Sequence, residues 1–185
     1  MRAEKSKTKT SAVRPSYRQG KKKIYVEPLK NTFAVQGKAD RLAAVSEALR
    51  PFGALTTIEP RRLLILTISD EANRDEALRV LQRLVDAGDV EFFTPVLRDE
   101  ESQLHQILTD EISVRFKKPL PSKALKAVEK KYGVKIARRN EFVPNQFVVK
   151  AAQPTGLRTL EVASQLDSAD EVEFATPNFI SEHKR

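Results

Sequence analysis

Few side chains in this chain are of the types that enzymes use for catalysis or metal binding. The two histidines, His105 and His183, lie far apart in polar segments and so do not form a pair at metal-binding spacing. We expect both to be surface residues rather than a metal ligand or a catalytic base.

Two acidic runs, Asp99-Glu100-Glu101 and Asp110-Glu111, lie near the middle of the chain. We expect solvated charge in a linker there, with contact to a partner as the alternative.

Other chemical motifs are missing from the sequence. It has no Gly-rich phosphate loop and no nucleophile elbow around any serine. The lack of cysteine excludes disulfides, thiol chemistry and thiolate metal ligands. We therefore predict a protein that is not an enzyme and has no catalytic residue, metal or cofactor. No stretch approaches 18 apolar residues and no secretory signal is visible, so we expect a cytoplasmic protein that does not contact membranes.

The net charge of +8 comes from one end of the chain. Residues 1–23 contain nine Lys or Arg and one Glu, which leaves the remainder neutral. We predict a disordered basic tail over residues 1–23, with a nucleic-acid or membrane-surface arm as the alternative. Tyr17 is its only aromatic residue, so we expect at most weak nucleic-acid binding.

An internal repeat organises the rest of the chain. The sequence VEFFTP at Val90–Pro95 recurs as VEFATP at Val172–Pro177, 82 positions later, and four upstream apolar residues recur at the same offset. We therefore predict two related modules, module 1 over residues 24–107 and module 2 over residues 108–185.

Each module reads as strand, helix, strand, turn, strand, helix, strand. The first helix of module 1 follows the strand Thr32–Gln36 and has Asp40 as its predicted cap, while that of module 2 follows Ile112–Phe116. The apolar residues at helical spacing are Val45, Ala48 and Phe52 in module 1 and Leu125, Val128 and Tyr132 in module 2. Both helices stop at a glycine, Gly53 or Gly133, which tolerates the left-handed conformation at a helix end.

Proline-centred turns, at Pro60 and at Pro144, are predicted to join the two middle strands of each module into hairpins. Asn73 with Glu76, and Thr155, are the predicted caps of the second helices. The VEF-x-TP segment supplies the fourth strand, whose proline predicts an edge or a strand end.

This order, βαββαβ, predicts an α+β fold of two tandem ferredoxin-like modules, each with a four-stranded antiparallel sheet and two helices on one face. The uncovered face is either a docking surface or the place where the two modules cover each other. RNA-recognition domains share the topology, but the third strands, RLLILTIS and QFVVKA, lack their aromatic and basic pattern.

Module 2 resembles the N-terminal prodomain of bacterial subtilisin-like serine proteases, the subtilases. Three segments carry the resemblance over residues 108–185: LTDEISVRFKK, KYGVKIARRNEFVPNQFVVK and ADEVEFATPNFISEHKR. Residues 31–107 share it only through the internal repeat. The Asp, His and Ser motifs of the protease domain are not in the sequence, so we expect either a prodomain fragment or a free-standing inhibitor or chaperone.

The resemblance implies a protein that assists folding of a subtilisin-like protease and then inhibits it. The sheet face would pack on the protease, and the C-terminal segment would lie in the active-site cleft as a substrate-like strand. The residues of this tail are Asn178, Phe179, Ile180, Ser181, Glu182, His183, Lys184 and Arg185. The alternative function is a non-enzymatic regulatory scaffold that binds another protein and carries a basic tail for a polyanion.

Overall fold

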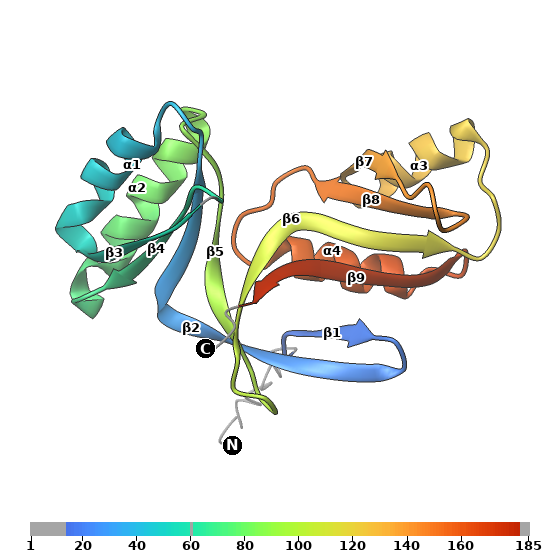
Figure 1. Cartoon of the computed structure of the whole chain (residues 1–185), viewed down its shortest axis with the longest axis horizontal. Helices are drawn as coiled ribbons and strands as arrows, with labels where there is room; N and C mark the ends of the chain where they lie inside the picture. The colour runs from blue at the N-terminus through green and yellow to red at the C-terminus, as the bar shows by residue number, and fades with distance from the viewer. Residues whose placement is uncertain (1–13, 60, 182–185) are drawn as a thin grey trace, which may run out of the picture.

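The computed structural model describes residues 14–59 and 61–181, which form an α+β protein with one antiparallel sheet of nine strands and four α-helices (Figure 1). The strands are β1 Ser16–Gln19, β2 Lys22–Gly37, β3 Gly53–Ile58, β4 Leu63–Ile68, β5 Val90–Asp99, β6 His105–Phe116, β7 Val134–Arg139, β8 Gln146–Ala151 and β9 Val172–Ser181. The helices are α1 Leu42–Leu49, α2 Arg74–Asp86, α3 Ser122–Tyr132 and α4 Arg158–Asp167, with short 3-10 turns at Arg50–Phe52 and Glu71–Asn73. Within these residues no helix is both long and apolar enough to cross a membrane.

The two halves of the chain have the same arrangement. Module 1 runs β2-α1-β3-β4-α2-β5 with strand order β3-β4-β2-β5, and module 2 runs β6-α3-β7-β8-α4-β9 with order β7-β8-β6-β9. In each half the two helices lie on the same side of the strands (Figure 1). The predicted α+β class is confirmed, but the two four-stranded units are parts of one larger sheet.

Four strands are long enough to take part in two regions of this sheet, one in a module and one at the junction between the modules. The first part of β2 and the end of β5 leave module 1, and the start of β6 and the end of β9 leave module 2. Together with β1 they form a junction sheet in the order β1-β2-β5-β6-β9. β5 pairs directly with β6, with Val96 opposite Ile107, and this pairing joins the two modules.

The repeated prolines lie where strands change sheet. The ladder of β2 with β5 shifts register between Phe33 and Pro28, beside Pro95, and that of β6 with β9 shifts between Leu108 and Ile112, beside Pro177. The sequence predicted an edge or a strand end at these prolines: β9 is an edge strand, since within the described residues it pairs only with β6, but β5 and β9 each continue for four residues beyond the proline, so neither strand ends there. A proline is tolerated within a sheet at such an irregularity, where its missing N–H leaves no ladder bond unmade.

Each module buries its own core between sheet and helices. The core of module 1 contains Phe33, Val35, Val45, Leu49, Leu64, Leu66, Ile68, Ala77, Leu81, Val90 and Phe93. That of module 2 contains Ile112, Val114, Phe116, Val128, Tyr132, Val134, Val149, Val162, Ala163, Leu166, Val172 and Ala175. A third cluster lies under the junction sheet, where Tyr17, Ile24 and Leu97 pack with Leu160 of α4.

The predicted disordered tail over residues 1–23 is wrong for residues 14–23. They form β1, a turn and the start of β2, and Tyr17 is only 8% exposed in the third cluster. Alternation of apolar and charged residues in Tyr17-Arg18 and Lys23-Ile24 places one face of this hairpin on the core. Residues 1–13 lie outside the described part of the chain.

The acidic run at the junction is ordered as well. Asp99 ends β5 and is 7% exposed, and its carboxylate accepts hydrogen bonds from the backbone N–H groups of Glu101 (2.9 Å) and Ser102 (2.7 Å). Burial raises the pKa of Asp99, but these bonds and the charge of Lys22 outweigh burial, so the pKa lies below its ordinary value. Asp99 therefore closes a tight β5–β6 hairpin rather than lying in a solvated linker.

The predicted helix caps are wrong at Asp40 and Thr155, because the N-cap residue of α1 is Arg41 and that of α4 is Leu157. Asn73 is the N-cap residue of α2, as predicted, but its side chain makes no capping hydrogen bond. Asp70 caps the preceding 3-10 turn instead, because its side chain accepts from the N–H of Ala72 at 2.9 Å. The predicted hairpins β3–β4 and β7–β8 are confirmed, and Pro60 lies outside the described residues.

The two helix-ending glycines have different roles. Gly133 has a φ of +64°, so its left-handed conformation at the end of α3 is as predicted. Gly53 is extended, and a Cβ there would lie 2.0 Å from the carbonyl oxygen of Thr67. Glycine is therefore required at Gly53 by the close approach of β4, not by backbone angle.

Candidate functional site

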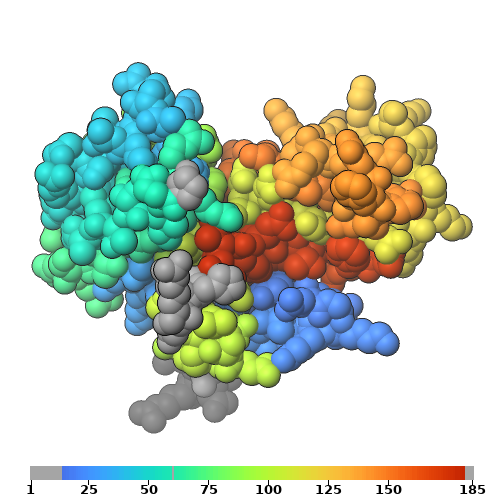
Figure 2. All heavy atoms as spheres, in the orientation of Figure 1, coloured from blue at the N-terminus to red at the C-terminus, as the bar shows by residue number. Residues whose placement is uncertain are grey.

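A groove of about 590 Å³ lies between the two modules. Module 1 contributes Gln36, Arg61, Glu91 and Phe92, and module 2 contributes Thr109, Asp110, Glu111 and the β9 residues Pro177, Asn178, Phe179 and Ile180. In Figure 2 the last part of β9, in red, lies between the two lobes. The groove thus brings together one predicted acidic run and the first residues of the predicted tail.

The floor of the groove is built where β6 bulges. Three residues of β6, from Thr109 to Glu111, lie opposite Asn178 alone, because the β6–β9 register shifts there. The Thr109 hydroxyl donates to the backbone carbonyl of Asn178 (3.0 Å) and accepts from the N–H of Glu111 (3.2 Å). Side-chain bonds thereby replace the missing ladder bonds at the bulge.

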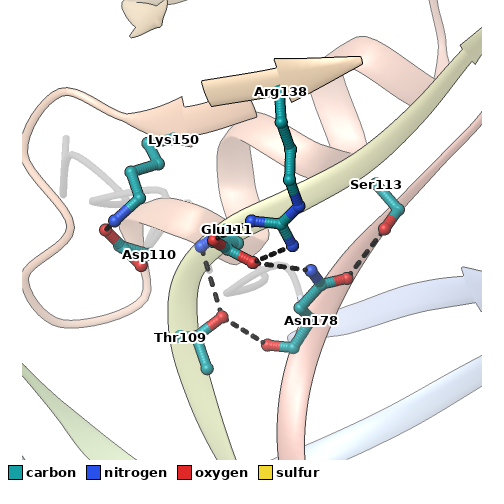
Figure 3. Close-up of polar contacts among 7 residues, drawn as sticks. All are labelled: Thr109, Asp110, Glu111, Ser113, Arg138, Lys150 and Asn178. Carbon is teal, nitrogen blue, oxygen red and sulfur yellow. Dashed lines mark hydrogen bonds and ion pairs between the residues drawn. The ribbon is translucent and has the colours of Figure 1, made fainter. Parts of the chain in front are cut away.

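Asn178 is the centre of a polar network that Figure 3 shows. Its amide Nδ2 donates to Glu111 Oε2 (3.3 Å), and its Oδ1 accepts from the Ser113 hydroxyl (2.9 Å). The guanidinium of Arg138 donates two bonds to the Glu111 carboxylate, at 2.8 and 3.1 Å. The network therefore connects β6, β7 and β9 across the open side of the module 2 sheet.

Charge pairing shifts the pKa values in this network. The Arg138 hydrogen bonds and charge lower the pKa of Glu111 despite an opposing effect of burial, and Asn178 and Lys150 lower it further. Lys150 pairs with Asp110 at 2.8 Å, and this contact raises the Lys150 pKa. The Glu111 carboxylate is therefore held ionised near neutral pH.

The arrangement holds strands together and offers little for catalysis. The Ser113 hydroxyl is directed to an amide oxygen rather than to a base. No group of three or more His, Cys, Asp or Glu within residues 14–59 and 61–181 is placed to hold a metal ion. What the site can supply is hydrogen bonding, charge and a shaped surface for a partner.

The outer face of a module is the sheet face opposite its helices. On module 2 it carries the pair Ser113 and Val148, with the guanidinium of Arg138 beside them, and Phe174 opposite Arg115. Ser113, Val148 and Phe174 are half-buried and Arg138 is exposed. This face is mixed in polarity, as surfaces of reversible complexes commonly are.

The predicted tail residues divide into two groups. Asn178 to Ser181 lie in β9, and Gln106–Leu108 of β6 pair with the last three of them. Phe179 packs on Tyr17 with ring centroids 4.7 Å apart, while Ile180 contacts the cluster formed by Ala34, Leu63, Val96 and Ile107. These four residues are thus bound to their own protein, and Glu182 to Arg185 lie outside the described residues.

His105 is not among the residues that line the groove. His105 is exposed at the start of β6, where it pairs in register with Arg98, and His183 lies outside the described residues.

Sequence reasoning missed the module 1 side of the groove. The third strand of that module, LLILTI, is apolar at nearly every position, which is typical of a strand buried on both faces. Its counterpart in module 2, QFVVKA, is less apolar, and fewer of its residues are buried. That contrast was available in the sequence and indicates which outer face is covered.

Comparison with known proteins gives a weak link to proteases. Over 116 residues the chain is 28% identical to the "calcium-dependent protease" of Nostoc sp. and, equally, to the protein of the same name from Trichormus variabilis. Each match covers 63% of this chain but only 17% of the relative's length. No family model matches the chain.

Among solved structures, the small subunit of acetolactate synthase from Thermotoga maritima is similar over 83% of this chain and 96% of its own. The TM-score is 0.26 and the sequence identity 11%, so this likeness carries no argument about function.

Proposed function

We propose that the chain is a non-enzymatic, prodomain-like protein that assists folding of a subtilisin-like serine protease and inhibits its active site, in cis before cleavage or in trans as a separate chain. Module 2 docks on the protease through its outer face, and the segment that follows β9 enters the cleft. The similarity to relatives named proteases covers only 116 residues. The activity described here goes beyond that similarity and is our proposal.

The observation that carries the proposal is the position of the motif residues. The three segments that resemble a subtilase prodomain contain most of β6 and β8, all of β7 and β9, and the end of α3. The four strands make up one sheet. Among residues 14–59 and 61–181, both helices of module 2 pack on the other face of that sheet, and β9 is the strand that precedes residues 182–185 in the chain. One sheet thus offers both a docking face and an exit for an extended segment.

The structure supports a division of the predicted tail. Asn178 to Ser181 already have sheet and side-chain partners, so entry of these four residues into a cleft would require breaking the contacts to β6 and Tyr17. We therefore assign Glu182 to Arg185 to the cleft and Asn178 to Ser181 to the root that holds them. This assignment narrows the eight-residue tail expected from the sequence.

The test is inhibition of a subtilisin-like protease assayed with a chromogenic peptide. The full chain should inhibit competitively with substrate. Removing residues 182–185 should weaken inhibition about a hundredfold, because about four net backbone hydrogen bonds of 0.5 to 1.5 kcal/mol each are lost. Removing residues 1–4 is the matched control and should change nothing.

Three results would count against the proposal. Turnover of the peptide by the chain alone, blocked by a serine-directed reagent, would make the protein an enzyme. Equal inhibition with and without residues 182–185 would exclude the cleft-binding segment. Absence of any complex with the protease would favour the alternative, a regulatory scaffold for another protein.

A further inference from the structure

The outer faces of the two modules differ sharply in composition and burial. On module 1 the face is apolar: Ala34 pairs with Ile65 across β2 and β4, and Leu63 pairs with Ile58 across β4 and β3. Ala34 and Leu63 are fully buried. At the equivalent place on module 2, Ser113 pairs with Val148 and both are half-buried.

The internal repeat shows the same contrast at a single aromatic position. Phe92 of VEFFTP and Phe174 of VEFATP are equivalent and both point to the outer face, because each lies opposite an outer-face residue of the neighbouring strand, Gln36 or Arg115. Phe92 is 5% exposed, whereas Phe174 is only half-buried. Something in this chain covers module 1 that does not cover module 2.

The cover consists of Ile107 of β6 and Ile180 of β9, which continue a row that begins at Val96 of β5. Val96, Ile107 and Ile180 lie side by side across β5, β6 and β9, since Val96 pairs with Ile107 and Ile107 pairs with Ile180. All three pack in one cluster with Ala34 and Leu63 of module 1. Ile107 is 1% exposed, so the contact is dry at its centre.

The end of β9 also has apolar contacts on its opposite face. Phe179 packs on Tyr17 of β1 and contacts the cluster that contains Leu108. Successive residues of β9 point to opposite faces of the junction sheet, so Phe179 and Ile180 hold the strand from both sides. Asn178, one residue earlier, is fixed by its bonds to Glu111 and Ser113.

We propose that the outer face of module 1 is an internal receptor for the strand that carries the C-terminal tail, which leaves the chain with one partner-binding face, on module 2. The proposal rests on the proposed function for the identity of the partner. Duplication has produced two modules with different roles: one binds the partner, and the other holds the root of the segment that enters the cleft. A held root reduces the conformational entropy that the tail loses on binding.

The first measurement needs no protease. In hydrogen exchange on the full chain, Ile180→Ala should speed exchange of the amides of residues 178–181 about tenfold, because it removes three carbons from a contact that closes the strand end. Phe142→Ala is the matched control, since Phe142 is 92% exposed at the β7–β8 hairpin, and it should leave these amides unchanged. Unchanged exchange in Ile180→Ala would overturn the proposal.

The second measurement is stoichiometry, by light scattering after size exclusion, with a subtilisin-like protease whose nucleophilic serine is replaced by alanine. One chain should bind one protease even with the protease in excess, and Phe174→Asp should abolish the complex. Two proteases on one chain would overturn the inference. Absence of any complex would count against the proposed function alone, because the exchange experiment still decides the role of module 1.

Discussion

The ion pair of Glu111 with Arg138 should stabilise the protein measurably, because it lies in the network that fixes the root of the tail. Two hydrogen bonds of 2.8 and 3.1 Å join the carboxylate and the guanidinium, a geometry typical of strong Arg–carboxylate pairs. The perturbation is a double-mutant cycle with Glu111→Gln, Arg138→Gln and the double variant. The cycle separates this pair from the contact of Glu111 with Asn178.

The expected size follows from exposure. The Glu111 side chain is 22% exposed, but that of Arg138 is 58% exposed, so solvent screens part of the attraction. Exposed pairs couple by about 0.2 to 1 kcal/mol, and hydrogen bonds to charged groups contribute about 1.5 to 3 kcal/mol. We expect a coupling energy of about 1 kcal/mol. The control pair, Glu76 with Arg79 on the surface of α2, should couple by about 0.3 kcal/mol.

The coupling should depend on pH with a defined sign. The pKa of Glu111 is lowered in the folded state by Arg138, so the contribution is fully present above the ordinary glutamate pKa of about 4.5. It decreases as the pH falls below that value and is lost once the pH passes the lowered folded pKa. Titration from pH 7 downward should therefore reduce the coupling, with no change between pH 6 and 8.

Urea unfolding at equilibrium, followed by circular dichroism at pH 7 and at pH 3, measures both quantities. A coupling energy equal to that of Glu76 with Arg79 would refute the reasoning that partial burial strengthens the pair. A coupling that grows in acid would refute the assignment of a lowered pKa.

Three further predictions concern stability. Gly53→Ala should destabilise the protein by about 3 kcal/mol in urea unfolding, since its Cβ would lie 2.0 Å from a β4 carbonyl oxygen, whereas Gly133→Ala, with open space around it, should cost about 1 kcal/mol; equal costs would contradict the steric argument. Deleting residues 1–23 removes β1 and its buried tyrosine and should lower the free energy of unfolding by about 3 kcal/mol, and a change near zero would contradict the assignment of that hairpin to the core. Truncation after Pro177 should destabilise by about 3 kcal/mol through loss of two apolar contacts, while truncation after Ser181 should leave the melting temperature nearly unchanged; equal melting temperatures for the two truncations would contradict the described packing of β9.

Much of the fold was predictable because the chain repeats itself. Two copies of one apolar pattern define two βαββαβ units, and the alternation within Ile112–Phe116 or Val134–Ile136 indicates which side faces the helices. The central hairpins follow from their turn residues.

What could not be predicted comes from contacts between the halves. A proline usually ends a strand, but Pro95 and Pro177 sit at bulges where a strand leaves one sheet for another, and only the partner strand reveals this. The segment around Tyr17 is too basic to indicate a strand, and its burial depends on Leu97 and Leu160 from distant parts of the chain. Asp99 lies in an acidic run, so its hydrogen bonds at the β5–β6 turn were likewise not predictable from the sequence.

The candidate site was not predicted as a site. Asp110-Glu111 were expected to be solvated linker charge and Asn178 part of a cleft-binding tail, whereas their meeting depends on the β6 bulge, a feature of register that no single strand carries. The signal for the covered face, by contrast, was present in the unbroken apolar strand LLILTI.

Occupancy of a protease active site is the central claim, and its most direct test is protection from a covalent label. A subtilisin-like protease is mixed with increasing amounts of the full chain, and the rate at which a fluorescent fluorophosphonate labels its nucleophilic serine is measured. The proposal predicts that the labelling rate falls in proportion to the fraction of protease bound and recovers when residues 182–185 are removed. A complex that forms while the serine is labelled at the unprotected rate would contradict the claim.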